Sequence, residues 1–167
     1  MGIYMRFDNG NPIKGDSTQQ GFEGKNGWMN LTSFKWGLDR KFATDQVGRA
    51  FNREAAQATV HPVIVSKDID ASSGALLEAA TIDFKGKECE IAFLRTGNPG
   101  EKYMLLKLQN TLIQKLNVSS QGENQRPQEE LVLDFTYVDI EVKVLNEANR
   151  QEDKMNITYD IATGVGS

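Results

Sequence analysis

Apolar side chains recur at every second position along most of this sequence, and such alternation is the pattern of half-buried β-strands. In the first candidate strand, Ile3, Met5 and Phe7 share one parity. The same pattern predicts further strands over residues 28–36, 60–67, 88–95, 102–118 and 154–161. Because the i, i+3, i+4 spacing of amphipathic helices is nearly absent, we predict a mainly β protein.

The segment ELVLDFTYVDIEVKV, residues 130–144, changes the parity of its apolar side chains. A row from Leu131 to Tyr137 is followed by a second row from Val138 to Val144 on the other parity. A strand that changes parity must either bulge or pass from one packing environment into another, as strands of curled barrels do. We therefore predict a β-barrel of two packed sheets and not a flat sheet.

Two segments break the alternation. Residues 72–80 predict one short helix at the side of the barrel, because Asp70, Ser72 and Ser73 offer cap oxygens and Leu76, Leu77 and Ala80 form an apolar stripe. Residues 38–59 are rich in charged and small side chains and are too long for a hairpin turn. We predict an extended loop there.

Composition limits the classes of function. The 167 residues suit a single domain over 1–167, and 19 basic against 23 acidic residues give a net charge of -4, which does not favour nucleic-acid binding. No apolar run approaches the ~20 residues that span a bilayer, and no secretory signal precedes the first strand. We therefore expect no membrane insertion and folding in the cytoplasm.

Candidate catalytic residues lack partners in the sequence. Cys89 and His61 are the only cysteine and the only histidine, so they cannot build a Cys/His metal site, and we predict no cofactor. Cys89 has the parity of buried Ile91 and Phe93, and same-face carboxylates such as Glu88 with Glu90 or Asp139 with Glu141 are typical of a solvated strand. The segment RFDNGNPIKGDST matches neither a calcium nor a phosphate loop and is interpreted as a turn. We predict that the protein is not an enzyme.

Four segments, in order and spacing, resemble the hemolysin-coregulated protein (Hcp) family of type VI secretion systems. They are IKGDST (13–18), GWMNLTSFKWG (27–37), VSKDIDASSGALLEAA (65–80) and SSQGENQRPQEELVLDF (119–135), and the closing YDIATGVG is similar to the last strand of the family. The resemblance covers nearly the whole chain. It implies a barrel of two packed sheets with one flanking helix, assembled as six-membered rings that stack into a hollow inner tube.

The resemblance also implies a mechanical role. A contractile sheath would expel the tube, tipped by a spike protein, and small secreted effectors would travel in its lumen. The protein would be cytoplasmic before assembly and would leave through the type VI apparatus without a signal peptide, as a plain tube subunit with no appended toxin domain.

Two sets of site residues follow from the resemblance. We expect Ser33 and Lys35 to contact cargo in the lumen, because they point away from a row formed by Trp28, Phe34 and Trp36. We expect the extended loop to contact neighbouring subunits or rings. Its charged residues are Asp39, Arg40, Lys41, Arg49, Arg53 and Glu54.

Three other functions remain open at this point. A tail-tube protein of a contractile phage-like particle would share the fold and the ring. A monomeric barrel would bind a small ligand in its interior. An enzyme would use His61, or Glu88 with Glu90.

Overall fold

The structure is a computed structural model that describes residues 1–8, 13–40, 58–83, 85–96, 101–145 and 152–166. Its elements in chain order are β1 (Gly2–Asp8), the 3₁₀ turn η1 (Gly24–Asn26), β2 (Trp28–Leu31), β3 (Ser33–Lys35), β4 (Leu38–Asp39), β5 (Thr59–Val60), β6 (Val63–Asp68), α1 (Ser73–Ile82), β7 (Lys87–Arg95), β8 (Glu101–Ser119), β9 (Gln128–Asp134), β10 (Tyr137–Leu145), β11 (Glu152–Asp160) and β12 (Val165–Gly166). The mainly β class and the one α-helix among the described residues confirm the sequence prediction.

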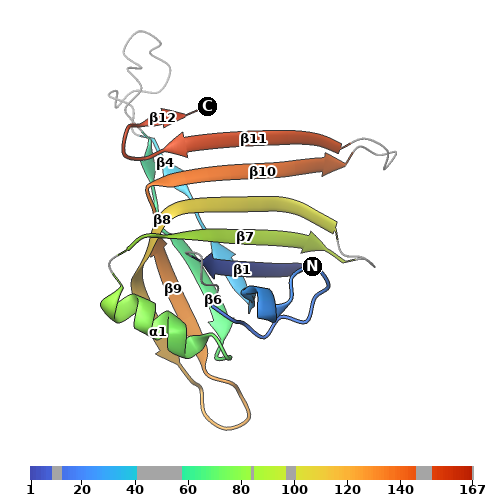
Figure 1. Cartoon of the computed structure of the whole chain (residues 1–167), viewed down its shortest axis with the longest axis vertical. Coiled ribbons are helices and arrows are strands. Elements are labelled where there is room, and N and C mark those ends of the chain that lie inside the picture. The colour runs from blue at the N-terminus through green and yellow to red at the C-terminus, as the bar shows by residue number, and fades with distance from the viewer. Residues whose placement is uncertain (9–12, 41–57, 84, 97–100, 146–151, 167) are drawn as a thin grey trace, which may run out of the picture.

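The larger sheet contains seven strands in the order β12-β11-β10-β8-β7-β1-β2, all antiparallel to their neighbours (Figure 1). Beyond β8 it continues into β10, β11 and β12, which we call the wing. A smaller layer is formed by β3, β6, β9 and the second half of β8. Two packed sheets were the predicted architecture.

The hydrogen-bonded ladder does not close into a complete barrel in the described part of the chain. Its path runs from β2 through β1, β7, β8, β9 and β6 to β3, and β2 and β3 are not paired with each other. They are consecutive in the chain, and the linking residue Thr32 donates its amide N–H to Ser66 O. The chain itself therefore joins the two layers on this side.

The parity change in residues 130–144 marks the passage between layers. β9 belongs to the smaller layer and β10 to the larger sheet, with Phe135 and Thr136 between them. Leu131, Leu133 and Val138 are all buried, so each strand presents its own parity to the same core. The sequence interpretation of two packing environments is confirmed.

One predicted row of side chains is wrong. Trp28 was expected to share a face with Phe34 and Trp36, but the chain changes sheets at Thr32, so parity does not carry over from β2 to β3. In β2 the core residues are Met29 and Leu31. Trp28 instead joins a second cluster with Ala92, Leu94 and Leu105 on the opposite face of the larger sheet.

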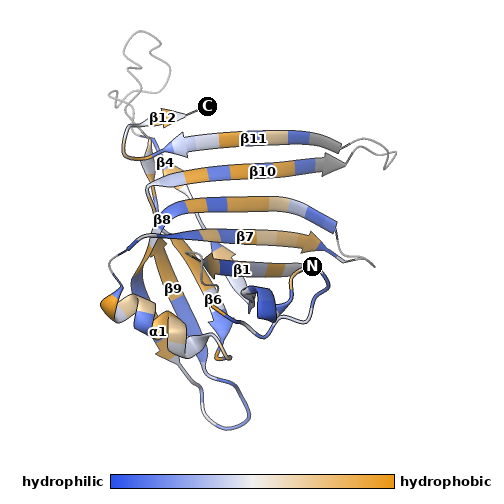
Figure 2. Ribbon diagram, in the orientation of Figure 1, coloured by the Kyte–Doolittle hydropathy of each residue, from blue (hydrophilic) through white to orange (hydrophobic). Residues whose placement is uncertain are grey.

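The space between the layers is filled by apolar side chains. Met5, Met29, Ile91 and Leu106 are fully buried there, and the strands alternate between hydrophobic and hydrophilic positions (Figure 2). Leu76 and Ala79 of α1 belong to the same core, so the helix packs its apolar stripe against it.

Two glycines provide a matched test of this packing. A Cβ on Gly86 would lie 2.6 Å from Asn110 Cα, where β8 turns, whereas a Cβ on Gly74 in α1 would meet nothing within 4 Å. We expect Gly86→Ala to lower the free energy of unfolding by about 1–3 kcal/mol because the backbones must move apart. Gly74→Ala, in the first turn of α1, should raise it by about 0.4–1 kcal/mol because alanine lowers the conformational entropy of the unfolded chain.

Urea unfolding followed by tryptophan fluorescence measures both changes, with all variants at one protein concentration so that association affects them equally. Equal stability of Gly86→Ala and wild type would contradict the close approach of these two backbones.

Candidate interaction surfaces

A buried lysine is the most unusual polar feature of the described residues. Lys67 has the same parity as buried Val63 and Val65 on β6, and its side chain is inaccessible to solvent. Its Nζ lies 2.8 Å from Asp70 Oδ1 and 3.0 Å from Glu129 Oε2, and it donates to Asp68 O at 2.8 Å. A cation can remain buried when it is paired and hydrogen-bonded in this way.

The two carboxylates have further donors from the start of α1. The Ser72 amide N–H and hydroxyl both donate to Asp70 Oδ1, and the Ser73 hydroxyl donates to Glu129 Oε2 at 3.1 Å. Burial by itself raises the pKa of the Asp70 carboxyl, but the hydrogen bonds from Lys67 and Ser72 outweigh burial and hold that pKa below its usual range. The pairing of Asp70 therefore adds stability above the pKa of the unfolded chain, and this stability is lost as the pH falls through the lower folded pKa.

This Lys67–Asp70–Glu129 cluster ties together β6, β9 and the start of α1. Asp70, Ser72 and Ser73, expected as cap oxygens, act in the turn before the helix, where Ser73 Oγ accepts from the Asp70 amide at 2.9 Å. The exposed fractions of the three charged side chains are 0%, 7% and 3%. A cluster so enclosed cannot meet a substrate, so its role is to fix the helix on the sheet.

The sequence contains a signal for this cluster. Lys67 and Glu129 occupy buried parity on two strands, and they face each other directly in the β6–β9 ladder. Opposite charges at buried parity, on Lys67 in one predicted strand and on Glu129 directly before the segment 130–144, would have paired the two strands in the correct register.

His61 has a partner that sequence reasoning missed. Its Nε2 lies 2.6 Å from Asp39 Oδ2, because β4 and β5 pair and bring residues 22 positions apart together. The backbone is held in place beside them, where Trp36 Nε1–H donates to His61 O at 3.0 Å. The side chains of His61 and Asp39 are 48% and 68% exposed, and no third His, Cys, Asp or Glu completes a metal-binding group in the described ranges.

The other catalytic candidates are engaged elsewhere. Cys89 is buried, and burial, with a smaller effect of the Glu90 charge, raises the pKa of its thiol. Glu90 pairs with Arg6 at 2.9 Å, and Glu141 pairs with Lys154 at 3.2 Å. These carboxylates are spaced along solvated strand faces and bind cations of neighbouring strands, which is an ordinary surface arrangement.

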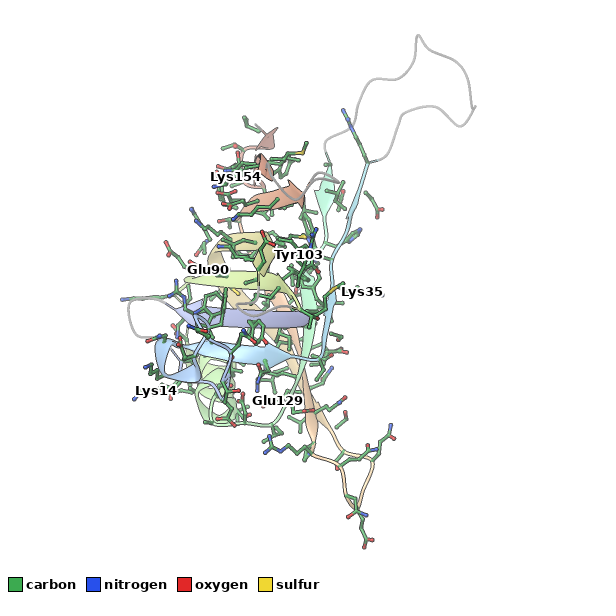
Figure 3. The ribbon with its side chains drawn as sticks, turned by 90° about the vertical axis from the view of Figure 1, so that its right-hand side faces the viewer. Lys14, Lys35, Glu90, Tyr103, Glu129 and Lys154 are labelled. Atoms are coloured by element: carbon green, nitrogen blue, oxygen red, sulfur yellow. The ribbon has the colours of Figure 1, made fainter. Side chains whose placement is uncertain are left out.

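Ser33 and Lys35 lie on the exposed side of the smaller layer. Both side chains are exposed on β3, while Phe34 between them packs edge-on against Phe93 in the core. Lys35 is at the right-hand side of the view in Figure 3, away from the larger sheet. Beside it lies a depression of about 350 Å³ that is mainly apolar and includes Trp36, Ile64 and Val132.

The extended loop is described only at its base. Leu38 and Asp39 pair with Val60 and Thr59, and Asp39 and Arg40 are exposed. The other predicted interface residues, Lys41, Arg49, Arg53 and Glu54, lie outside the described residues. In the described part of the chain, no helix is long and apolar enough to cross a membrane.

Comparison with known families decides the classification. The sequence model of the family described as "Type VI secretion system effector, Hcp" matches residues 4–143. The chain belongs to the Hcp family. Hcp proteins are secreted, structural tube subunits of type VI secretion systems and assemble into rings, so the predicted family is confirmed.

Solved structures of this family share the fold. A structure described as a type six secretion system protein superposes with a TM-score of 0.85 at 17% identity, over 99% of each chain. Hcp1 from Salmonella typhimurium gives 0.70 at 15% identity over 100% of each chain. Hcp1 from E. coli EAEC 042 gives 0.69 at 20% identity, over 93% of this chain and 98% of that chain. A comparison with curated protein sequences finds no match.

The buried cluster predicts a large effect of one substitution. Lys67→Met leaves Asp70 and Glu129 as buried carboxylates without a cation, and we expect it to lower the free energy of unfolding by about 3–5 kcal/mol. The control Lys154→Met removes the partner of Glu141 at the surface, where such a pair contributes about 0–1 kcal/mol. Urea titrations of both variants measure the difference, and equal losses would contradict a structural role for Lys67.

Proposed function

We propose that this Hcp protein is a subunit of six-membered rings that stack into the hollow inner tube of a type VI secretion system. The observation that supports this function is the family match over residues 4–143 together with a fold shared over 99% of a type six secretion system protein. Glu90 and Glu141 pair with cations of neighbouring strands and Cys89 is buried, which agrees with a mechanical role.

The tube would act together with two other parts of the machine. A contractile sheath surrounds it and drives it outward, and a spike protein forms its tip. The subunit would be cytoplasmic before assembly and would leave the cell through the apparatus without a signal peptide. A tube that assembles, is expelled and then dissociates is best served by contacts between stacked rings that are polar and reversible.

We assign cargo contact to the exposed side of the smaller layer around Ser33 and Lys35. This face combines an ammonium group on β3 with the mainly apolar depression beside Trp36 and Ile64. If it lines the lumen, a small secreted effector would meet both kinds of contact. Lys35 would favour effectors that present acidic side chains.

We assign contacts between rings or neighbouring subunits to the extended loop. Asp39 and Arg40 are exposed where the loop begins. With Lys41, Arg49, Arg53 and Glu54 they give the loop charges of both signs. Mixed charges can pair with those of an identical copy and are weakened by salt.

The assembly state tests the proposal. By light scattering after size exclusion we expect a mass about six times the 18.6 kDa of the chain, and by electron microscopy six-fold annuli with an open centre. A chain that stays monomeric at every concentration would overturn the ring. It would favour the monomeric ligand-binding barrel, although the filled interior between the layers argues against that function.

Charge reversal tests the loop assignment. We expect Arg49→Glu and Arg53→Glu to reduce the length and number of stacked tubes at low salt. The melting temperature of the subunit should change by less than about 2 °C, because charges that act between copies contribute little to folding of the single chain. Negative-stain images give tube length, and differential scanning fluorimetry gives the melting temperature. A large loss of melting temperature in either variant would mean that these residues pack within the subunit.

A further inference from the structure

The inner side of the wing is an apolar surface that the fold leaves partly uncovered. Along β11, Met155 and Ile157 have the parity of the core residue Tyr159, yet their exposed fractions are 58% and 49%. They face Val142 and Ile140 on β10 in the ladder. The smaller layer covers the opposite end of the larger sheet. The wing side chains that have the parity of the core are therefore partly exposed to solvent.

A wholly apolar hollow extends this surface. It has a volume of about 170 Å³ and lies between the wing and the β4–β5 pair, with Ile140, Ile157, Trp36 and Leu38 among its lining residues. Leu38 is itself 54% exposed. Large apolar side chains gathered in this way on a soluble protein mark a surface that another protein covers.

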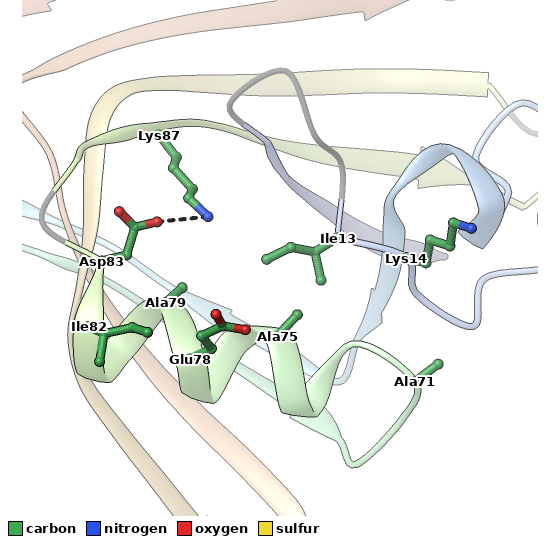
Figure 4. A pocket seen from close by; sticks show the side chains of 9 residues that line it. All are labelled: Ile13, Lys14, Ala71, Ala75, Glu78, Ala79, Ile82, Asp83 and Lys87. Carbon is green, nitrogen blue, oxygen red and sulfur yellow. Dashed lines mark ion pairs between the residues drawn. The ribbon is translucent and has the colours of Figure 1, made fainter.

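A groove along α1 is the second uncovered surface. It has a volume of about 690 Å³ and lies between the helix and the segment at Ile13 and Lys14 (Figure 4). Ala75 and Ala79, one helical turn apart, leave the space open, and Ile82, 64% exposed, forms one end of it. Met155 and Ile157 project from one strand face about 7 Å apart. This spacing is close to the distance of about 6 Å between Ala75 and Ala79, the two small residues that widen the groove.

The charges of the groove do not oppose an apolar partner. Lys14, Lys87, Glu78 and Asp83 line its edges and sum to zero. Lys87 Nζ already pairs with Asp83 Oδ2 at 3.0 Å. The wing rows formed by Val142 with Met155, and by Ile140 with Ile157, carry no charge. Docking these rows between the edges of the groove would keep the Lys87–Asp83 pair intact and leave the exposed Lys14 and Glu78 in contact with solvent.

The two surfaces lie toward opposite ends of the molecule. The wing occupies the upper end of the view in Figure 1 and α1 the lower part. Because they are different surfaces of one chain, contact between them in two copies is heterologous, and repeated contacts of this kind close into a ring when the rotation permits. We propose that the inner side of the wing of one copy docks into the α1 groove of the next copy. This inference rests on the proposed ring and names the surfaces that build it.

Two single substitutions test this contact from its two sides. Met155→Lys places a charge on the wing surface, and Ile82→Lys places one at the groove, and both native side chains are more than half exposed. We expect each variant to remain folded and to require at least about tenfold more protein for half assembly, because a charge at a docked apolar contact is costly.

Matched controls lie on the same elements. Leu77→Lys changes an equally exposed residue of α1 that does not line the groove, and Val165→Lys changes a residue of β12 that faces Asp160 on the other side of the wing. Both controls should assemble like wild type. Sedimentation velocity over a concentration series measures all four variants.

A one-to-one mixture separates this contact from a symmetric one. The intact groove of Met155→Lys can accept the intact wing of Ile82→Lys, but the pair then presents only two damaged surfaces, so we expect a species of two copies and no ring. The measurement is made at ten times the concentration at which wild type is half assembled.

The possible outcomes are distinct. Three results would overturn the pairing of wing and groove while the ring itself stands. They are a mixture that stays monomeric, rings formed by Ile82→Lys as readily as by wild type, and controls that lose assembly as much as the two test variants. A wild-type protein that never assembles would overturn the ring and this contact together.

Discussion

The two layers are held in one molecule by β8, whose first half pairs with β7 and β10 and whose second half pairs with β9. At the junction Asn110 has a φ of 52°, a conformation in which asparagine is enriched. The buried parity changes there from Leu106 and Leu108 to Thr111 and Ile113. Without this turn the apolar rows of the two halves would lie on opposite faces of one sheet, and no common core would form. The turn also frees the first half of β8 to carry the wing beyond the core.

The Lys67–Asp70–Glu129 cluster completes this arrangement at the smaller layer. Leu76 and Ala79 of α1 are held by apolar packing, which has no preferred direction and does not by itself fix the position of the helix along the sheet. The paired charges and hydroxyl donors of the cluster are directional and fix the start of the helix in one position. The free-energy cost of burying three charged side chains is offset by the hydrogen bonds among them. The cluster thereby specifies the position of the start of α1. A fixed helix gives the groove beside it a constant shape. Hcp proteins assemble into rings, and surfaces of constant shape suit such repeated contacts between copies.

Much of the fold could be predicted from the sequence, because strand period and parity are local properties. The alternation of Ile3, Met5 and Phe7 and the parity change near Tyr137 were interpreted correctly as strands and as a passage between layers. The prediction that Trp28 shares a face with Phe34 and Trp36 was wrong because parity holds only within one strand. No residue pattern in the sequence indicates that the chain passes from one layer to the other at Thr32. His61 and Asp39 are joined by a pairing of β4 with β5 that no local pattern announces. Lys67 was missed because only apolar residues were followed along the strands, although its partner Glu129 had the matching parity.

Cys89 has a consequence for the life of the protein outside the cell. Hcp proteins are secreted, and an oxidising environment links exposed thiols into disulfides. Cys89 is the only cysteine of the sequence, and its side chain is enclosed in the core, where the neutral thiol is the favoured form. Under the proposed export, a thiol so enclosed would not join copies of this chain to one another through sulfur. Their association would then depend on concentration and salt, so dilution after release would favour their separation.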